Sequence, residues 1–367
     1  MAEWIDTTLG EFLVLQRGHD LPKSQRLAGE VPVVGSGGIT GLHNEAKVSG
    51  PGVTIGRAAN LGVPTFVEQD FWPLNTTLYV RDFRGSNARF VFHLFQVLDL
   101  TGFNSGSVQP MLNRNYIASL PIRVPSRRGQ DAIAEVLGVL DDKIAVNERI
   151  AEVSRDLAES LYLQALAPSG SWEMRELGTV ASVVMGQSPP GEAVNRTGEG
   201  RALLNGPTEF GRHSPTPAQW TSVSPRVCEK NDLLLCVRGS TTGRMNWADR
   251  AYAIGRGLGA IRAKASVEET SLIRLSLSRG MDGLLARANG SVFPNLSRDV
   301  ILGFPIPWPE VENRTRLVKV VSDFDADAAA RAEESSTLAT LRDTLLPQLM
   351  SGRLRVKDAE KIVEDHV

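Results

Sequence analysis

The amino-acid sequence predicts an α+β protein with two globular α/β domains, related by pseudo-twofold symmetry and separated by a pair of long antiparallel coiled-coil helices. A repeat is the first observation: GSVQPMLNRNYIASLPIRVP at 106–125 returns as GSVFPNLSRDVILGFPIPWP at 290–309, with ten identical positions and no gap. The second is the length of 367 residues, which suits two domains with their own cores plus connectors. Helical periodicity follows each copy and is the third.

The two globular domains are expected at residues 1–125 and 168–309. They also begin alike, because LGEFLVLQRGHDLP at 9–22 matches LGTVASVVMGQSPP at 177–190 through two glycines, a leucine and a proline. The β-rich runs GVTIGR, TTLYV, DLLLCV and AIRA, at 52–57, 76–80, 232–237 and 260–263, are separated by Gly, Pro and Asn. This pattern favours irregular α/β domains that share a frame and differ in their middles.

The long helices are expected at residues 126–167 and 310–352, followed by a C-terminal tail at 353–367. Apolar residues recur there at alternating spacings of four and three, which is a heptad seam. Helices of roughly 60 Å are too long to be covered by a compact domain, so we expect them to pair with each other rather than each on its own domain. Arg342 interrupts the second seam, where Leu341 can substitute, and Pro347 is expected to kink that helix. The predicted helix-pairing residues are Ile133, Leu137, Leu140, Ile144, Leu317, Val321, Phe324, Leu338 and Leu345.

Composition indicates a soluble, cytoplasmic protein. Hydrophobic residues make up 42% and charged residues 22% of the chain. We expect no export signal, since Glu3 and Asp6 lie in the first residues, and no apolar run is long enough for a membrane span. The two cysteines, Cys228 and Cys236, form no CxxC motif and are expected in the core.

Charge is distributed unevenly along the chain. The net charge is 0 over 1–125, −3 over 126–167, +4 over 168–309 and −3 over 310–367. The acidic helices suit protein docking, because DNA phosphates would repel them. Two copied domains joined by a self-complementary helix pair have the local dyad symmetry of a DNA duplex, so DNA is the partner that the symmetry suggests.

Motifs that would indicate catalysis are incomplete or absent in this sequence. SPPG at 188–191 lacks the aromatic and the amide or acid of an amino-methyltransferase motif, and GRGLG at 255–259 is not followed by the acidic partner of a dinucleotide site. There is no GxxxxGK[ST] loop for ATP, and the five histidines have no metal spacing. We therefore expect no catalytic residue, no metal ligand and no cofactor bound by this chain.

Polar residues in glycine-rich loops remain as candidates for DNA contacts. Arginine pairs in two prongs with guanine, Asn or Gln with adenine, and Ser or Thr with phosphate or base. Each of these loop residues has an alternative interpretation as a solvated arginine or a turn-forming asparagine. The predicted DNA-binding residues are Ser36, Arg57, Asn60, Asn75, Arg114, Asn205, Arg238, Ser240, Thr241, Arg244, Asn246 and Arg256.

Over essentially its whole length the chain resembles the specificity subunits of type I restriction-modification systems. The likeness lies in the LG…G…P openings, the GSV-x-P-x-L closings, the PIxxP exits, and helices that end in SLYLQAL and TLLPQLMSGRL. The stretches VVGSGGITGLHNEA, DFWPLNTTLYV, GQSPPGEAVN and AIGRGLGAIR of this chain resemble recurrent recognition-domain sequences of that family. The chain departs from the family at Arg314, where a glutamine like Gln130 is common, and at Ala58 and Ala59, where Lys-Gly is common.

This resemblance implies a non-catalytic targeting subunit. Its two target-recognition domains would each read one half of a bipartite DNA site, and the helices would set the spacer. The implied partners are two methyltransferase subunits, which hold S-adenosylmethionine and methylate adenine, and motor-endonuclease subunits, which use ATP and Mg and cut unmethylated DNA. Two alternatives are a coiled-coil adaptor without sequence-specific DNA binding and the specificity component of a combined restriction-methyltransferase enzyme.

Overall fold

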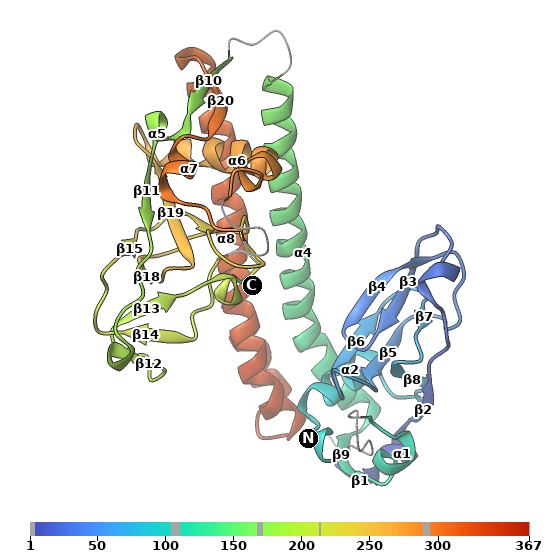
Figure 1. Ribbon diagram of the computed structural model, residues 1–367. Helices are drawn as coiled ribbons and strands as arrows, with labels where there is room; N and C mark the ends of the chain where they lie inside the picture. The colour runs from blue at the N-terminus through green and yellow to red at the C-terminus, as the bar shows by residue number, and fades with distance from the viewer. Residues whose placement is uncertain (1–3, 104–110, 167–171, 213, 289–293, 367) are drawn as a thin grey trace. The chain divides into compact units, whose positions relative to one another are not determined.

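The chain forms two compact units in the computed structural model, which describes residues 4–103, 111–166, 172–212, 214–288 and 294–366 (Figure 1). Unit 1 comprises Met1–Ala145 and Ser336–Val367, and unit 2 comprises Val146–Ser335. Each unit therefore holds one globular domain and a part of both long helices, whereas the predicted boundaries kept the helices separate from the domains. The start of each closing repeat, at 106–110 and 290–293, lies outside the described residues.

Unit 1 contains a four-stranded sheet of order β2-β8-β5-β6, a three-stranded sheet of order β4-β3-β7 and the pair β1-β9. Helix α2 packs on β5 and β6 (Figure 1). The elements are β1 (Trp4–Thr8), α1 (Leu9–Phe12), β2 (Val14–Arg17), β3 (Val31–Gly35), β4 (Gly38–His43), β5 (Gly52–Gly56), β6 (Pro64–Val67), β7 (Trp72–Pro73), β8 (Thr77–Asp82), α2 (Ala88–Val97), α3 (Arg114–Ile117) and β9 (Pro121–Pro125), with 3-10 turns at Lys23–Gln25 and Thr101–Phe103.

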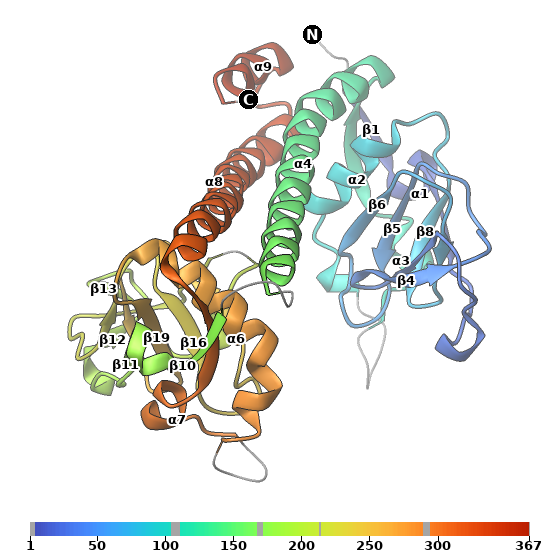
Figure 2. The same cartoon turned by 90° about the horizontal axis from the view of Figure 1, so that it is seen from above.

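Unit 2 contains sheets of order β11-β19-β16-β17 and β12-β14-β13-β18-β15 and the pair β10-β20. Helix α6 packs against the first of these sheets (Figure 2). The elements are β10 (Trp172–Glu176), α5 (Leu177–Val180), β11 (Ala181–Met185), β12 (Val194–Asn195), β13 (Arg201–Leu204), β14 (Gln219–Thr221), β15 (Val227–Cys228), β16 (Leu233–Cys236), β17 (Met245–Trp247), β18 (Tyr252–Ile254), β19 (Leu258–Ala263), α6 (Thr270–Leu285), α7 (Arg298–Leu302) and β20 (Pro305–Pro309), with 3-10 turns at Gly191–Ala193, Pro207–Glu209 and Val267–Glu269.

The sequence repeat is also a structural repeat. β1 pairs antiparallel with β9, and β10 pairs antiparallel with β20, over five residue pairs in each unit. A parallel pair recurs as β3-β7 and β13-β18. At the repeated Gly18 and Gly186, a Cβ atom would lie 2.2 Å from the Leu74 carbonyl oxygen and 2.1 Å from that of Gly255, so neither position accepts a side chain. The predicted α+β class and the duplicated domains are confirmed.

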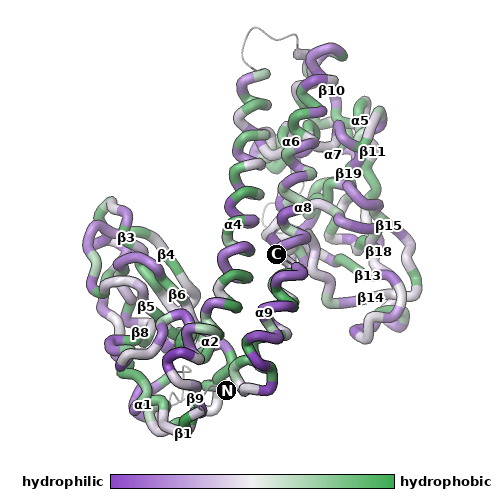
Figure 3. Tube along the Cα trace, turned by 180° about the vertical axis from the view of Figure 1, so that it is seen from behind, coloured by the Kyte–Doolittle hydropathy of each residue, from purple (hydrophilic) through white to green (hydrophobic). Residues whose placement is uncertain are grey.

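Two long helices, α4 (Arg127–Ala165) and α8 (Val311–Met350), have 39 and 40 residues. Hydrophobic and hydrophilic turns alternate along both (Figure 3). In unit 1 the beginning of α4 packs with the end of α8, and in unit 2 the end of α4 packs with the beginning of α8. The helix pair is therefore antiparallel, as predicted. Pro347 lies inside α8, close to its last residue.

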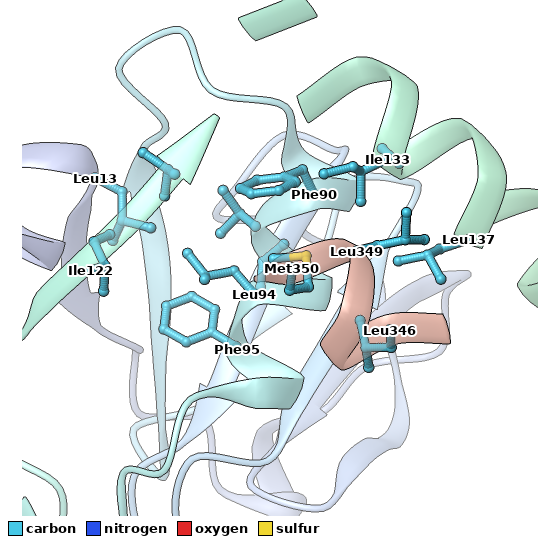
Figure 4. Close-up of a cluster of buried hydrophobic side chains, with 14 of the residues drawn as sticks. Leu13, Phe90, Leu94, Phe95, Ile122, Ile133, Leu137, Leu346, Leu349 and Met350 are labelled. Atoms are coloured by element: carbon cyan, nitrogen blue, oxygen red, sulfur yellow. The ribbon is translucent and has the colours of Figure 1, made fainter. Parts of the chain in front are cut away.

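The apolar stripe of each helix is covered by its own domain as well as by the other helix. In unit 1, Ile133 and Leu137 of α4 lie in one core with Phe90 of α2 and with Leu346 and Leu349 of α8 (Figure 4). The expectation that helix pairing alone covers the stripe is thus wrong. Of the nine predicted helix-pairing residues, Ile144, Leu317 and Phe324 are half-buried and pack on a core, and six are fully buried: Ile133, Leu137, Leu140, Val321, Leu338 and Leu345.

The end of the chain confirms one expectation, that Leu341 substitutes for Arg342 in the seam, and corrects another. Arg342, which interrupts the heptad seam, donates from Nη1 to the Asp141 carboxylate at 2.9 Å, while Leu341 packs against the core. Residues 353–367, expected as a tail, contain helix α9 (Val356–Glu364). Its Ala359 and Val363 are one turn apart and are buried in the core of unit 1, because four-residue spacing places both on one helix face. Among the described residues, no helix combines the length and apolarity that a membrane span needs.

Candidate nucleic-acid interface

Three loops of unit 1 meet and bring four of the predicted residues together. Ser36 lies in the β3–β4 turn, Arg57 and Asn60 in the β5–β6 loop, and Asn75 in the β7–β8 turn. A Cβ atom on Gly37 would lie 2.9 Å from the Asn60 side-chain nitrogen, so the first two loops are in contact. The Arg57 amide donates to the Thr76 carbonyl at 2.8 Å, and this bond joins the second loop to the third.

The four side chains differ in how free they are to bind a ligand. Asn60 is exposed and Ser36 is half-buried. The Arg57 guanidinium is half-buried and donates to the Asn75 carbonyl at 3.4 Å, so it joins the β5–β6 loop to the β7–β8 turn. The Asn75 amide donates to the Asp20 carboxylate, which in turn lies 3.5 Å from Arg17. Asn60 and Ser36 are therefore the side chains that a ligand reaches without breaking an internal bond.

Unit 2 builds the corresponding site from its own three loops. Asn205 follows β13, Arg256 lies in the β18–β19 turn, and the predicted residues between Arg238 and Arg244 lie in the β16–β17 loop. A Cβ atom on Gly255 would lie 2.4 Å from the Asn205 side-chain oxygen, so Asn205 rests against the β18–β19 turn. The Val237 amide donates to the Gly257 carbonyl at 2.9 Å and thereby joins the remaining loop.

The β16–β17 loop presents its arginines from a fixed backbone. The Thr242 hydroxyl lies within hydrogen-bonding distance of two carbonyl oxygens, that of Gly239 at 2.7 Å and that of Pro294 at 3.0 Å. Below it, the Cys236 thiol lies 3.6 Å from the Thr241 hydroxyl. Arg238, Ser240, Arg244 and Arg256 are exposed, and Thr241 is half-buried. These three arginine side chains and the Ser240 hydroxyl, on loops held in place by hydrogen bonds, suit the recognition of phosphates and of guanine edges.

The two sites occupy equivalent positions of the structural repeat. In unit 1, Leu112 donates its amide to the Arg57 carbonyl at 2.8 Å, and in unit 2, Leu296 donates to the Val237 carbonyl at 2.9 Å. These leucines are identical positions of the sequence repeat. The loop bearing Arg57 and the loop bearing Arg238 are thus copies of one structural position that carry different side chains.

Two predicted residues do not belong to these clusters. The Asn246 side chain is only 9% exposed, donates to the Gly211 carbonyl at 3.0 Å and accepts from the Trp247 amide at 2.7 Å. It cannot reach a base without losing both bonds, so the fold does not present Asn246 for DNA contact. Arg114 is exposed but lines a separate cavity of about 320 Å³ with Arg81 and Arg84.

Sequence reasoning missed polar residues that lie directly beside the clusters. Asp20 bonds Asn75 in unit 1, and Gln219 accepts from the Asn205 side chain at 2.9 Å in unit 2. Gln187 is exposed, and its backbone amide donates to the Ile254 carbonyl at the edge of the β18–β19 turn. The signal for Gln187 was present, because it follows the repeated Gly186, which packs against that turn.

Among the residues that the structure describes, no three His, Cys, Asp or Glu side chains are grouped so that they could hold a metal ion. Cys228 and Cys236 are free thiols in the core, as expected. Burial raises the pKa of Cys228 to about 11, so this thiol is protonated at neutral pH.

Known proteins match the fold of nearly the whole chain and the sequence of its N-terminal part. Residues 1–154 match the family model for the type I restriction modification DNA specificity domain. A solved type I restriction-modification S subunit from M. genitalium superposes with a TM-score of 0.65 over 95% of this chain and 96% of that one. At 16% identity this likeness shows the fold alone. The solved structure shows a shared fold over nearly the whole chain, and the family match covers its N-terminal 154 residues.

Two curated relatives match parts of the chain. A protein of Methanocaldococcus jannaschii assigned as the MjaX type I restriction enzyme specificity subunit is 26% identical over 267 residues, which are 68% of this chain and 63% of the relative. The EcoprrI specificity subunit of Escherichia coli is 29% identical over 154 residues, 40% of this chain and 38% of that protein. The match thus spans less than two thirds of either relative. The chain is thus similar to type I restriction enzyme specificity subunits over part of its length.

Proposed function

We propose that this chain is the DNA sequence-specificity subunit of a type I restriction-modification complex. The three-loop cluster of unit 1 reads one half-site and that of unit 2 reads the other, while α4 and α8 set the spacer between them. The observation that carries the proposal is the duplication of one three-loop cluster at equivalent positions, with different side chains in each copy. Equivalent scaffolds with different contact residues are what reading two different half-sites requires.

The chain acts as a targeting subunit without catalysis of its own in this proposal. Two methyltransferase subunits that hold S-adenosylmethionine bind it and methylate an adenine in each half-site, after the base is flipped out of the duplex. Motor-endonuclease subunits that use ATP and Mg²⁺ join the complex and cut unmethylated DNA. The acidic segments 126–167 and 310–367 favour protein partners on the helices over DNA.

Long-read methylation sequencing tests this function. A methylation-free host receives the neighbouring methyltransferase gene with or without the gene for this chain. We expect a split motif with a fixed, unspecified spacer to be methylated only when the chain is present. If an active methyltransferase methylates the same sites in both strains, the chain is an adaptor and the proposed function is wrong.

A further inference from the structure

Each long helix holds the domain of its own unit at a residue near the helix start. Gln130 of α4 is buried. Its side-chain oxygen accepts from the backbone amide of Asn87 at 3.0 Å, and its side-chain nitrogen donates to the Pro125 carbonyl at 3.1 Å. Asn87 is the N-cap of α2. This contact, the first anchor of unit 1, fixes the beginning of α2 against the beginning of α4.

The first anchor of unit 2 stands at the equivalent position and has different chemistry. Arg314, 184 residues after Gln130, lies near the start of α8 and forms an ion pair with Glu269 at 2.9 Å between Nε and Oε1. Glu269 is the N-cap of α6 and is buried. The arginine that departs from the family pattern is therefore matched by a carboxylate on the domain helix.

A second anchor lies eleven residues further along each long helix, which is about 16 Å of helix. In unit 1, the Asp141 carboxylate lies 3.5 Å from Nε2 of the fully buried His93 on α2, a close contact in which Nε2 forms no hydrogen bond. In unit 2, the equivalent Asp325 accepts from Nη2 of Arg274 on α6 at 2.9 Å. In both units an acidic residue at the same repeat position faces a side-chain nitrogen of the domain helix, but only Asp325 of unit 2 accepts a hydrogen bond from it.

Two anchors restrict a domain more than one anchor does. The apolar core already joins each domain to the long helices, and two polar contacts separated by three helical turns add a directional constraint that apolar packing lacks. Both anchors of unit 2 are ion pairs with little solvent exposure, so loss of one partner leaves a buried charge without compensation.

We propose that residues 130 and 141 in unit 1 and residues 314 and 325 in unit 2 are positioning residues, which set the direction in which each domain presents its loop cluster. The partners differ between the units, so each domain fits its own helix: Glu269 facing a glutamine, or Asn87 facing an arginine, would leave one polar group unmatched. The consequence for DNA rests on the proposed function, because the direction of the loop clusters then determines the spacer that is accepted.

The distance between domain and helix in unit 2 tests this proposal without DNA. The full chain carries spin labels at Val223→Cys and Val320→Cys, which are 46% and 37% exposed, while the native cysteines are buried. We expect Arg314→Gln to broaden the label–label distance distribution and to lower Tm by about 5 °C. The double variant Glu269→Asn with Arg314→Gln recreates the pair of unit 1 and should restore both values. Arg316→Gln, an exposed position on the same helix, is the matched control and should change neither.

The outcomes separate positioning from mere stability. A lower Tm with an unchanged distance distribution would mean that Arg314 only stabilises the unit. A double variant no better than the single one would show that positions 269 and 314 are not a pair. If Arg314→Gln does not fold, Asp325→Asn gives the same distance test at the second anchor. A narrow distribution that depends on the anchors, in a chain that directs no methylation, would uphold the positioning residues and refute the proposed function.

Discussion

Truncation of Leu137 to alanine tests how the long helices enter the cores. Leu137 of α4 is fully buried in the core that α4 shares with α2 and the end of α8, and Figure 4 shows it beside Leu349. Because three elements surround it, the core cannot close over the missing atoms, and we expect a loss of about 3 to 4 kcal/mol in the free energy of unfolding. Val139→Ala on the same helix, where the side chain is 41% exposed, should cost less than about 1 kcal/mol.

Calorimetry and hydrogen exchange measure this effect together. The predicted loss corresponds to a decrease in Tm of roughly 6 to 16 °C for a unit of this size. Amides of α2 and of the last turns of α8 should lose protection in the Leu137→Ala variant, since both elements share this core. A loss no larger than that of Val139→Ala, or exchange confined to α4, would refute the shared core.

Three further predictions follow from single groups. Arg238→Ala or Arg244→Ala should weaken binding of the complex with its methyltransferase to the DNA site by about 1 to 3 kcal/mol, with the loss confined to one half-site, while the exposed Arg196→Ala should have little effect. Burial lowers the pKa of His93, so the unfolded chain takes up this proton first and stability should fall as the pH drops below about 6.5; His93→Gln should remove this dependence in denaturant titrations, and an equal slope in both proteins would contradict the assignment. The Cys228 thiol, whose pKa is raised to about 11, should react with iodoacetamide at pH 8 only after unfolding, and rapid modification of the folded chain would show that it is accessible.

The features that the sequence predicted well are those written in one segment of chain. The repeat, the β-rich runs and the heptad spacings of residues such as Ile133 and Leu137 depend on local periodicity, and the structure confirms the strands, the long helices and their antiparallel pairing. The glycine openings of the two copies were also readable, because Gly18 and Gly186 lie where no Cβ atom fits. Local sequence patterns were therefore sufficient to predict the strands, the long helices and the duplicated domains.

The features that failed depend on partners far away in the chain. Arg342 looked like a defect in the seam because its partner, Asp141, lies two hundred residues earlier. Asn246 looked like a base-reading residue until its neighbours in the fold bound both ends of its amide. The same holds for Arg314, whose departure from the family is explained only by Glu269. A pattern reports which face of a segment is apolar, but not which group lies opposite it.

The separate reading of two half-sites by two loop clusters is the central claim, and one measurement tests it directly. The methylated motif is determined by long-read sequencing for the wild-type chain, for Asn60→Ala in unit 1 and for Arg256→Ala in unit 2, both of which are exposed loop positions. We predict that Asn60→Ala relaxes one half of the motif and Arg256→Ala relaxes the other, with the spacer unchanged. Variants that alter the same half, or a motif that neither variant changes, would contradict the account.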